Sequence, residues 1–224
     1  MGKKPRMKIG LLGGTFNPIH IGHLRGAEEI RETLGLDRIY FIPSSISPHK
    51  DSSDIASPAD RLKMVELATG ENPFFEVCDI EIKRGGPSYT VHTLEYFSSE
   101  FPDSEIYFIL GAELFCEIHT WREYRRLFEL SNFAVITRPG FPHFTSVPLA
   151  LGDDFRYYKD EENVIFYRHK GSNKTLALVK IEGIQVSSTR IRDLIKKNSS
   201  IKYLVPREVE VYILENKIYT KEAL

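Results

Sequence analysis

The stretch at residues 7–35 reads MKIGLLGGTFNPIHIGHLRGAEEIRETLG, and its pattern decides the fold class. Its first six residues, 7–12, form a short apolar run that is typical of a buried strand. Residues 23–35 place apolar side chains at helical spacing and end on glycine, a common helix terminator. The order predicts a strand, a glycine-containing turn and a helix. The apolar stripe of that helix comprises Leu24, Ala27, Ile30 and Leu34.

The same alternation of strands and helices continues along the chain. We expect further strands at 38–43, 74–82, 105–110, 133–138 and 176–181. We expect helices at 58–69, at 88–101 and at roughly 113–130, and then two helices between Thr189 and about Leu214 that break at Pro206. Strands that alternate with helices favour βαβ crossovers. The predicted class is therefore α/β, with a doubly wound, mostly parallel, Rossmann-like sheet and a small C-terminal helical tail.

The chain reads as a single domain over residues 1–224, with a core at about 7–188 and the helical tail at about 189–224. Two regions show no clear period. Residues 44–57 are rich in Ser, Asp and Pro and read as a surface loop. Residues 139–176 mix Pro, Gly, His and aromatic residues and read as an irregular excursion.

The composition excludes several classes of protein. Lys and Arg total 30 against 31 for Asp and Glu, whereas proteins that coat nucleic acid usually carry a strong basic excess. No apolar stretch reaches the length of a spanning helix, and the apolar run near the N-terminus is too short for a signal peptide. Cys78 and Cys116 stand far apart without a CxxC pair, so we expect ordinary thiols. We therefore expect a cytoplasmic protein that binds neither nucleic acid nor membranes.

The string GGTFNPIHIGH joins the first predicted strand to the first predicted helix. In a doubly wound sheet, ligands bind outside the carboxyl ends of the strands. Gly13 and Gly14 allow the backbone to approach a phosphate, and Thr15 adds a hydroxyl. His20 and His23 project from one face at the helix N-terminus, where the helix dipole favours anions. The string therefore predicts a site for phosphate groups.

Other interpretations of this string lack support elsewhere in the sequence. A Walker A loop would need Gly-Lys-Ser/Thr, and the GxGxxG fingerprint of dinucleotide-binding folds is also missing. Without that fingerprint, Asp37 is not a convincing ribose-binding acid. A bare HxxH can mark two surface histidines or begin a zinc site, but no third ligand follows at a suitable spacing.

The string VSSTRIR at residues 186–192 follows a predicted strand and begins a helix. A serine at a helix start is an ordinary N-cap, which would explain Ser187 or Ser188 alone. Three consecutive hydroxyl residues, the N–H groups of the helix N-terminus and two arginines also form a cradle suited to a triphosphate.

Together the two strings resemble the HxGH nucleotidyltransferase family, whose second signature has the form SSTxIR. The resemblance implies that His20 and His23 bind the nucleoside triphosphate and steady its transition state, with Arg192 as a third catalytic residue. Arg190 occupies the variable position, so we expect it to be exposed to solvent. The implied ATP-binding residues are Gly13, Gly14, Thr15, Phe16, His20, His23, Ser187, Ser188, Thr189 and Arg192.

Three further strings resemble the bacterial nicotinate mononucleotide adenylyltransferases. They are SISPHK (45–50), GGPSYTVHTL (85–94) and ILGAELFCEIHTWREY (109–124). The resemblance implies that Lys50 meets a phosphate, that Tyr89 and Thr90 contact the pyridine end, and that Trp121 stacks on the ring. An aromatic plate suits a flat heterocycle, although core packing also explains a lone tryptophan.

The resemblance covers residues 7–139 and 176–219, with two departures that bear on the acceptor. Glu113 stands where the family usually has Asp, and Arg122 stands where an aromatic residue is frequent. The signature of the cytidylyltransferases is missing, and His20 replaces the Thr of phosphopantetheine adenylyltransferases. Both differences favour the branch that acts on pyridine nucleotides.

The implied reaction is an in-line attack by the 5′-phosphate of nicotinate mononucleotide on the α-phosphorus of ATP, which gives deamido-NAD and pyrophosphate. Mg²⁺ is expected to arrive with ATP rather than in a protein metal site. Two alternatives stay open: a transferase for nicotinamide mononucleotide or another phosphorylated acceptor, and a nucleotide-binding sensor without turnover. The sequence leaves the oligomeric state open.

Overall fold

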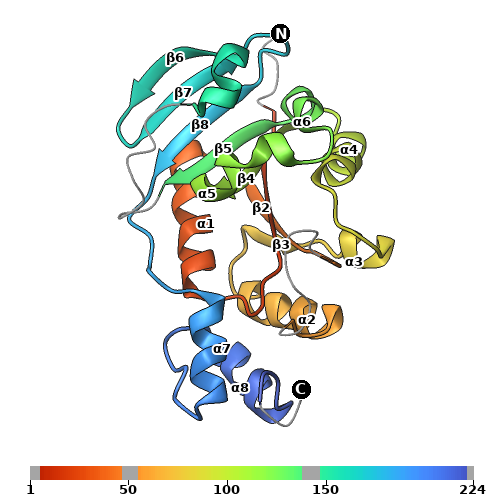
Figure 1. Cartoon of the computed structure of the whole chain (residues 1–224), viewed down its shortest axis with the longest axis vertical. Helices are drawn as coiled ribbons and strands as arrows, with labels where there is room; N and C mark the ends of the chain where they lie inside the picture. The colour runs from red at the N-terminus through yellow and green to blue at the C-terminus, as the bar shows by residue number, and fades with distance from the viewer. Residues whose placement is uncertain (1–5, 47–54, 138–146, 221–224) are drawn as a thin grey trace. The chain divides into compact units, whose positions relative to one another are not determined.

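The structure is a computed structural model that describes residues 6–46, 55–137 and 147–220 (Figure 1). The strands are β1 (Lys8–Gly14), β2 (Arg38–Pro43), β3 (Phe75–Val77), β4 (Glu105–Gly111), β5 (Asn132–Thr137), β6 (Phe155–Glu161), β7 (Val164–His169) and β8 (Thr175–Lys180). The α-helices are α1 (Ile21–Leu34), α2 (Pro58–Thr69), α3 (Ile80–Arg84), α4 (Thr90–Glu100), α5 (Ala112–Cys116), α6 (Tyr124–Leu130), α7 (Ser188–Lys196) and α8 (Arg207–Glu215), with short 3₁₀ helices at η1 (Ile118–Thr120) and η2 (Leu149–Asp154). None of the helices in these three ranges combines the length and the apolar character needed to cross a membrane.

The strands form one sheet in the order β3-β2-β1-β4-β5-β8-β7-β6. The pairs β1–β4, β4–β5 and β5–β8 are parallel, whereas β8–β7 and β7–β6 are antiparallel. The predicted α/β class with a mostly parallel sheet is therefore confirmed. The bounds of β2 and α2 match the predicted ranges, and two C-terminal helices lie on either side of Pro206 as expected.

The chain divides into two compact units. The first comprises Met1–Leu12, Glu29–Ile39 and Tyr89–Glu182. Its buried core is rich in aromatic rings: the ring of Phe128 lies 4.7 Å from Phe133 and 5.1 Å from Phe155, centroid to centroid. Gly10 in β1 allows close packing, because a Cβ atom there would come within 2.9 Å of side-chain atoms of Ile109 and Leu36.

The second unit comprises Gly13–Glu28, Tyr40–Ser88 and Gly183–Leu224. Its helix α2 starts with Ser57 as N-cap, whose hydroxyl accepts from the N–H of Asp60 at 3.1 Å. Helix α8 packs against α2, and the Tyr212 hydroxyl donates to the Asp60 carboxylate at 2.9 Å. Both predicted phosphate-binding strings lie in this unit.

The predicted strand at 74–82 is wrong for most of its length. The strand ends at Val77, the Cys78 N–H donates to the Phe41 carbonyl at 2.9 Å, and α3 begins at Ile80. Ile80 and Ile82 alternate with charged residues, which is the pattern expected of a strand. The short helix is supported by an ion pair between Lys83 and Asp79, one turn apart at 3.1 Å, and pairs at this spacing stabilise helices.

Two other stretches differ from expectation. The helix predicted at 113–130 is divided into α5, η1 and α6. Glu117 (φ −99°, ψ 1°) separates α5 from η1. The extended Trp121 (φ −77°, ψ 149°) and the left-handed Glu123 (φ 53°, ψ 38°) separate η1 from α6. The region predicted as irregular contains the hairpin of β6 and β7, which lies beside β8 (Figure 1). Every residue of β6 after Phe155 is exposed. This strand therefore shows no apolar alternation that a sequence pattern could reveal.

Candidate functional site

The loop after β1 is shaped by the ring of Phe16. Phe16 is buried and has a left-handed backbone (φ 46°), a conformation that bulky residues rarely adopt. Its ring packs edge-on against His23 at 5.2 Å and lies close above Gly14, where a Cβ atom would come within 3.1 Å of it. The Gly14 carbonyl accepts from the N–H of Ser44 at 2.9 Å. The ring of Phe16 thus leaves little room for a side chain at the second glycine of the string.

His20 and His23 form a reciprocal pair at the start of α1. The N–H of His20 donates to Nδ1 of His23 at 3.3 Å. The N–H of His23 is shared between the His20 carbonyl at 2.9 Å and Nδ1 of His20 at 3.3 Å. The two rings are stacked, with centroids 3.7 Å apart and planes 21° apart. A nitrogen that accepts a hydrogen bond carries no proton, so each neutral ring bears its proton on Nε2 and can donate only from that atom.

Gly22, between the two histidines, has no room for a side chain. A Cβ atom there would lie 2.9 Å from the carbonyl oxygen of Ile184 and 3.1 Å from Nδ1 of His20. The contact with Ile184 would be to backbone, which cannot swing aside as a flexible side chain could. The glycine of the HxGH string therefore allows α1 to approach the segment that leads into α7.

The second string is bound directly to the first. The Ser188 hydroxyl donates to the Pro18 carbonyl at 2.9 Å, and Nη1 of Arg192 donates to the Asn17 carbonyl at 2.8 Å. Nε of Arg192 is buried and has no hydrogen-bond partner in the described part of the chain. The structure thus brings the predicted residues of both strings together within one unit.

The first turn of α7 also shows what its hydroxyl groups do locally. Ser187 is the N-cap, and its hydroxyl accepts from the N–H of Arg190 at 3.2 Å. The Thr189 hydroxyl accepts from Nη2 of Arg192 at 3.5 Å. The side chain of Arg190 is exposed, as predicted. The simple capping role that the sequence allowed for Ser187 is therefore present.

A buried polar network around Asn17 was not predicted from the sequence. Oδ1 of Asn17 accepts from the Tyr219 hydroxyl at 2.8 Å and from the N–H of Ala56 at 2.9 Å. The side chain of Arg61 is fully buried nearby and donates to the carbonyl of Thr15 at 2.9 Å. Burial raises the pKa of Tyr219 far above its usual value, although the Arg192 and Arg61 guanidinium groups oppose this. The tyrosine is therefore a protonated donor at neutral pH.

One signal in the sequence could have revealed Arg61. It lies on the same face of α2 as Met64 and Val65, at helical spacing, and both of these residues are buried. A charged residue on an apolar stripe is an exception to the expected pattern. No comparable signal exists for Tyr219, because its partner is distant in the sequence.

The residues predicted for the pyridine end lie in the other unit. Tyr89 precedes α4, and Thr90 is the first residue of that helix. The Arg122 guanidinium lies 4.8 Å from the centroid of the Tyr89 ring. Trp121 is half-buried and meets Phe108 edge-on at 6.2 Å. Arg122, one of the departures from the family, thus covers a predicted site residue.

Lys50, the last predicted site residue, lies outside the described residues. Glu113, the other departure, lies in the first turn of α5 with its carboxylate folded back toward Gly111, where a Cβ atom would come within 2.7 Å of Oε2. The carboxylate of Asp37 accepts from the N–H of Lys8 at 2.7 Å. Asp37 thus has a local structural role.

Neither a disulfide nor a cluster of metal ligands occurs among the residues described. Both Cys78 and Cys116 are free thiols, and burial raises the pKa of each. No group of three His, Cys, Asp or Glu side chains lies close enough together to hold a metal ion in those ranges.

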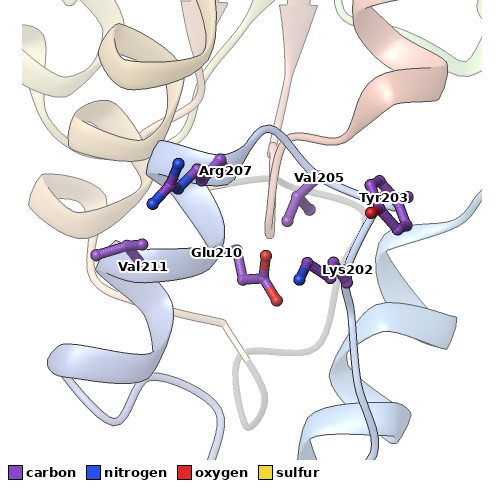
Figure 2. A pocket seen from close by; sticks show the side chains of 6 residues that line it. All are labelled: Lys202, Tyr203, Val205, Arg207, Glu210 and Val211. Carbon is purple, nitrogen blue, oxygen red and sulfur yellow. The ribbon is translucent and has the colours of Figure 1, made fainter.

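A separate hollow of about 510 Å³ lies in the C-terminal part of the second unit. Its lining residues are Lys202, Tyr203, Val205, Arg207, Glu210 and Val211. Figure 2 shows the side chains of Lys202 and Glu210 among those that line it. No residue of the two strings lines this hollow, but the neighbouring Leu204 carbonyl accepts from the N–H of Ile21 at the start of α1, at 3.1 Å.

Comparisons with known proteins agree on one family. The model of the cytidylyltransferase-like family matches residues 11–194. A protein of Geotalea daltonii named probable nicotinate-nucleotide adenylyltransferase is 42% identical, over 95% of this chain and 98% of its own length. A protein of Syntrophotalea carbinolica with the same name is 43% identical, over 96% and 99%.

Solved structures show a similar fold. The nicotinic acid mononucleotide adenylyltransferase of Plasmodium falciparum, complexed with NaAD, superposes with a TM-score of 0.70 at 19% identity, over 96% of this chain and 98% of its own. The chain therefore belongs to the cytidylyltransferase-like family, together with the proteins named probable nicotinate-nucleotide adenylyltransferase.

Proposed function

We propose that this protein transfers the AMP part of ATP to nicotinate mononucleotide, forming deamido-NAD and pyrophosphate. The observation that carries the proposal is the histidine pair of α1, bound through Asn17 and Pro18 to the SSTRIR string. Relatives that align over nearly the whole chain bear the name of this activity.

The triphosphate of ATP is proposed to bind at the N-terminus of α1 and at the first turn of α7. His20 and His23 would donate from Nε2 to oxygens on the α-phosphate, where negative charge increases in the transition state. The N–H groups at the start of α7 and the arginine Arg192 would hold the outer phosphates. The other residues of this proposed site are Gly13, Gly14, Thr15, Phe16, Ser187, Ser188 and Thr189.

In the proposed step, a 5′-phosphate oxygen of the mononucleotide attacks the α-phosphorus of ATP in line with the bond to the β-phosphate. The new P–O bond forms as the bond between the α-phosphorus and its bridging oxygen breaks, and pyrophosphate leaves with the electron pair. The attacking phosphate is already ionised at neutral pH, so no strong general base is required. Catalysis then consists of positioning and charge stabilisation, as in other phosphoryl transfers.

A divalent cation, proposed to be Mg²⁺, would enter with ATP as part of the substrate. Mg²⁺ usually keeps several water ligands and binds to substrate phosphates rather than to a protein cage. The mononucleotide is proposed to contact Lys50 through its phosphate and Tyr89, Thr90 and Trp121 through its pyridine ring. We also propose that the whole chain works as one nucleotidyltransferase domain.

Pyrophosphate release with ATP and Mg²⁺ tests the proposal, with nicotinate mononucleotide and nicotinamide mononucleotide as competing acceptors. Mass spectrometry of the product identifies the dinucleotide. Strong release with the nicotinate compound and little with the nicotinamide compound is expected. Preference for the nicotinamide compound would overturn the proposal that nicotinate mononucleotide is the acceptor. If pyrophosphate is released with neither compound, a nucleotide-binding sensor without turnover would be favoured.

A further inference from the structure

The side chain of Arg61 donates to three backbone carbonyls from three segments of the second unit. Nη1 donates to Thr15 at 2.9 Å, Nη2 to Ser45 at 2.9 Å and Nε to Ala56 at 3.1 Å. The residue is 1% exposed, which makes it one of the largest fully buried side chains. Each of its three nitrogens thus serves a different part of the chain.

The partners show that Arg61 holds backbone and does not neutralise an acid. No carboxylate in the described ranges pairs with it. Burial lowers the pKa of the guanidinium and the nearby Tyr219 raises it, but arginine keeps its proton in proteins. A buried cation is costly unless its N–H groups are satisfied. Such a group is retained where its planar, fork-shaped geometry is needed.

The three segments held by Arg61 lead to different parts of the proposed site. Thr15 belongs to the GGTFNPIHIGH string. The N–H of Ser45 donates to the hydroxyl of Ser88 at 3.0 Å, and Ser88 directly precedes Tyr89. Ala56 is also bound to the first string, because its N–H donates to Oδ1 of Asn17. Arg61 therefore links the loop proposed for ATP to a segment that is hydrogen-bonded beside Tyr89, a residue proposed to contact the mononucleotide.

We propose that Arg61 is a positioning residue that sets the spacing between the ATP loop (residues 13–17) and the acceptor loop (residues 44–46). The proposal rests on the proposed function, because an in-line attack requires the acceptor oxygen and the α-phosphorus to meet at about 3–3.5 Å. A displacement of about 1 Å can reduce the rate by about 10²-fold. Arg61 touches no reacting atom, and its effect is exerted through the carbonyls of Thr15 and Ser45.

The test compares Arg61→Gln and Arg61→Lys with the wild type and with Lys63→Gln. Lys63 lies on the same helix, is about half exposed and pairs with Glu66 on the surface, so its variant controls for charge loss on α2. The measurements are kcat, the Kd of ATP alone and the rate of hydrogen exchange in peptides covering residues 13–17 and 44–46. Activity is normalised to the folded fraction by circular dichroism.

Arg61→Gln should lower kcat by about 10²-fold while the Kd of ATP changes by less than about threefold, since either loop alone can still bind. Arg61→Lys should lower kcat by about tenfold, because a single ammonium group cannot reach all three carbonyls that the planar guanidinium binds. Exchange should rise in the two loop peptides and stay unchanged in α8. A purely structural role would instead lower the melting temperature and leave kcat per folded molecule unchanged.

The inference is overturned if folded Arg61→Lys has the kcat of the wild type. It is also overturned if neither Arg61 variant folds, because Arg61 would then be needed for folding in general and not for the spacing of the two loops. The proposed function is judged separately, on the wild type. If the wild type forms no dinucleotide, the result argues against the proposed function. If the wild type is active and Arg61→Gln has the same kcat, the result argues against the inference alone.

Discussion

The imidazole rings of His20 and His23 lie stacked with their centroids 3.7 Å apart, and each ring accepts the backbone N–H of the other residue at Nδ1. The pair therefore caps the start of α1 with two rings where most helices use one serine or aspartate. It also fixes the tautomer, since both rings must carry the proton on Nε2.

This geometry predicts which substitutions preserve function at the two histidines. Glutamine can place an amide N–H near the position of Nε2, whereas the amide of asparagine reaches only as far as Nδ1. His20→Ala, His23→Ala and the asparagine variants should lose about 10²–10³-fold in kcat, the usual cost of removing an oriented donor. The glutamine variants should retain about tenfold more activity than these.

Steady-state kinetics measures this series, with circular dichroism as a check on folding. His119→Ala is the matched control, because His119 is an exposed histidine of η1 in the other unit. Equal activity in the glutamine and asparagine variants would contradict the assignment of Nε2 as the donor.

Arg192 and Arg190 should respond in opposite ways to the same change. Arg192→Gln removes the hydrogen bond to the Asn17 carbonyl and the cation proposed for the phosphates. We expect kcat/KM for ATP to fall at least about tenfold, since a hydrogen bond to a charged group contributes about 1.5–3 kcal/mol. Arg190→Gln alters only an exposed side chain and should stay within about twofold of wild type. Similar losses in both variants would indicate a general charge effect.

Gly22→Ala should both destabilise the protein and reduce its activity. The new methyl group would lie 2.9 Å from the Ile184 carbonyl and 3.1 Å from Nδ1 of His20. Forcing an extra methyl group into a packed site costs about 1–3 kcal/mol of stability. The displaced ring of His20 would also lose its hydrogen bond from the N–H of His23. Urea unfolding and turnover check the two effects. Gly152→Ala is the control, because a Cβ atom there meets nothing within 4 Å; equal behaviour of the two variants would exclude the steric explanation.

Tyr219→Phe should destabilise the protein near neutral pH, and its cost should shrink at high pH. At neutral pH the variant loses the hydrogen bond to Asn17, worth about 1 kcal/mol. Burial raises the pKa of Tyr219 in the folded state, while the unfolded chain ionises near the ordinary value of about 10. The stabilising contribution of Tyr219 is therefore complete below about pH 10 and declines as the pH rises.

Urea unfolding of the wild type and Tyr219→Phe at pH values from about 7 to 11 measures this difference. The advantage of the wild type should fall over the upper part of the range. Tyr203 is 81% exposed, so Tyr203→Phe should follow the wild type throughout. A difference between wild type and Tyr219→Phe that does not vary with pH would contradict the protonated, buried donor.

The parts of the fold that the sequence predicted well are those with a strong period or a clear terminator. Residues 58–69 combine an apolar stripe with a serine cap and a proline in the first turn, and α2 has these bounds. Residues 74–82 show where a hydrophobic pattern misleads. Isoleucines that alternate with charged residues are compatible both with a strand and with one turn of helix. The exposed strand β6 had no apolar face to detect.

In the candidate site, local features could likewise be predicted from the sequence, whereas contacts between distant residues could not. The two strings could be recognised because each is contiguous and lies where a strand meets a helix. Their mutual contacts could not, because Ser188 and Arg192 bind carbonyl groups of Pro18 and Asn17, and backbone carbonyls have no signature in a sequence. Tyr219 was missed because its partner, the side chain of Asn17, lies 202 positions away. Arg61 also binds backbone carbonyls, although its place on the apolar stripe of α2 marks it as an exception.

The hydrogen bond from Tyr219 to Asn17 also bears on how the protein is made. Its two residues are separated by 202 positions, so the ribosome synthesises the first string long before the tyrosine that completes its hydrogen bonding. A nascent chain that has reached α2 would contain the histidine pair and Arg61, but neither Arg192 nor Tyr219. The loop after β1 can therefore acquire its final set of contacts only late in synthesis, after the second string and residue 219 have emerged.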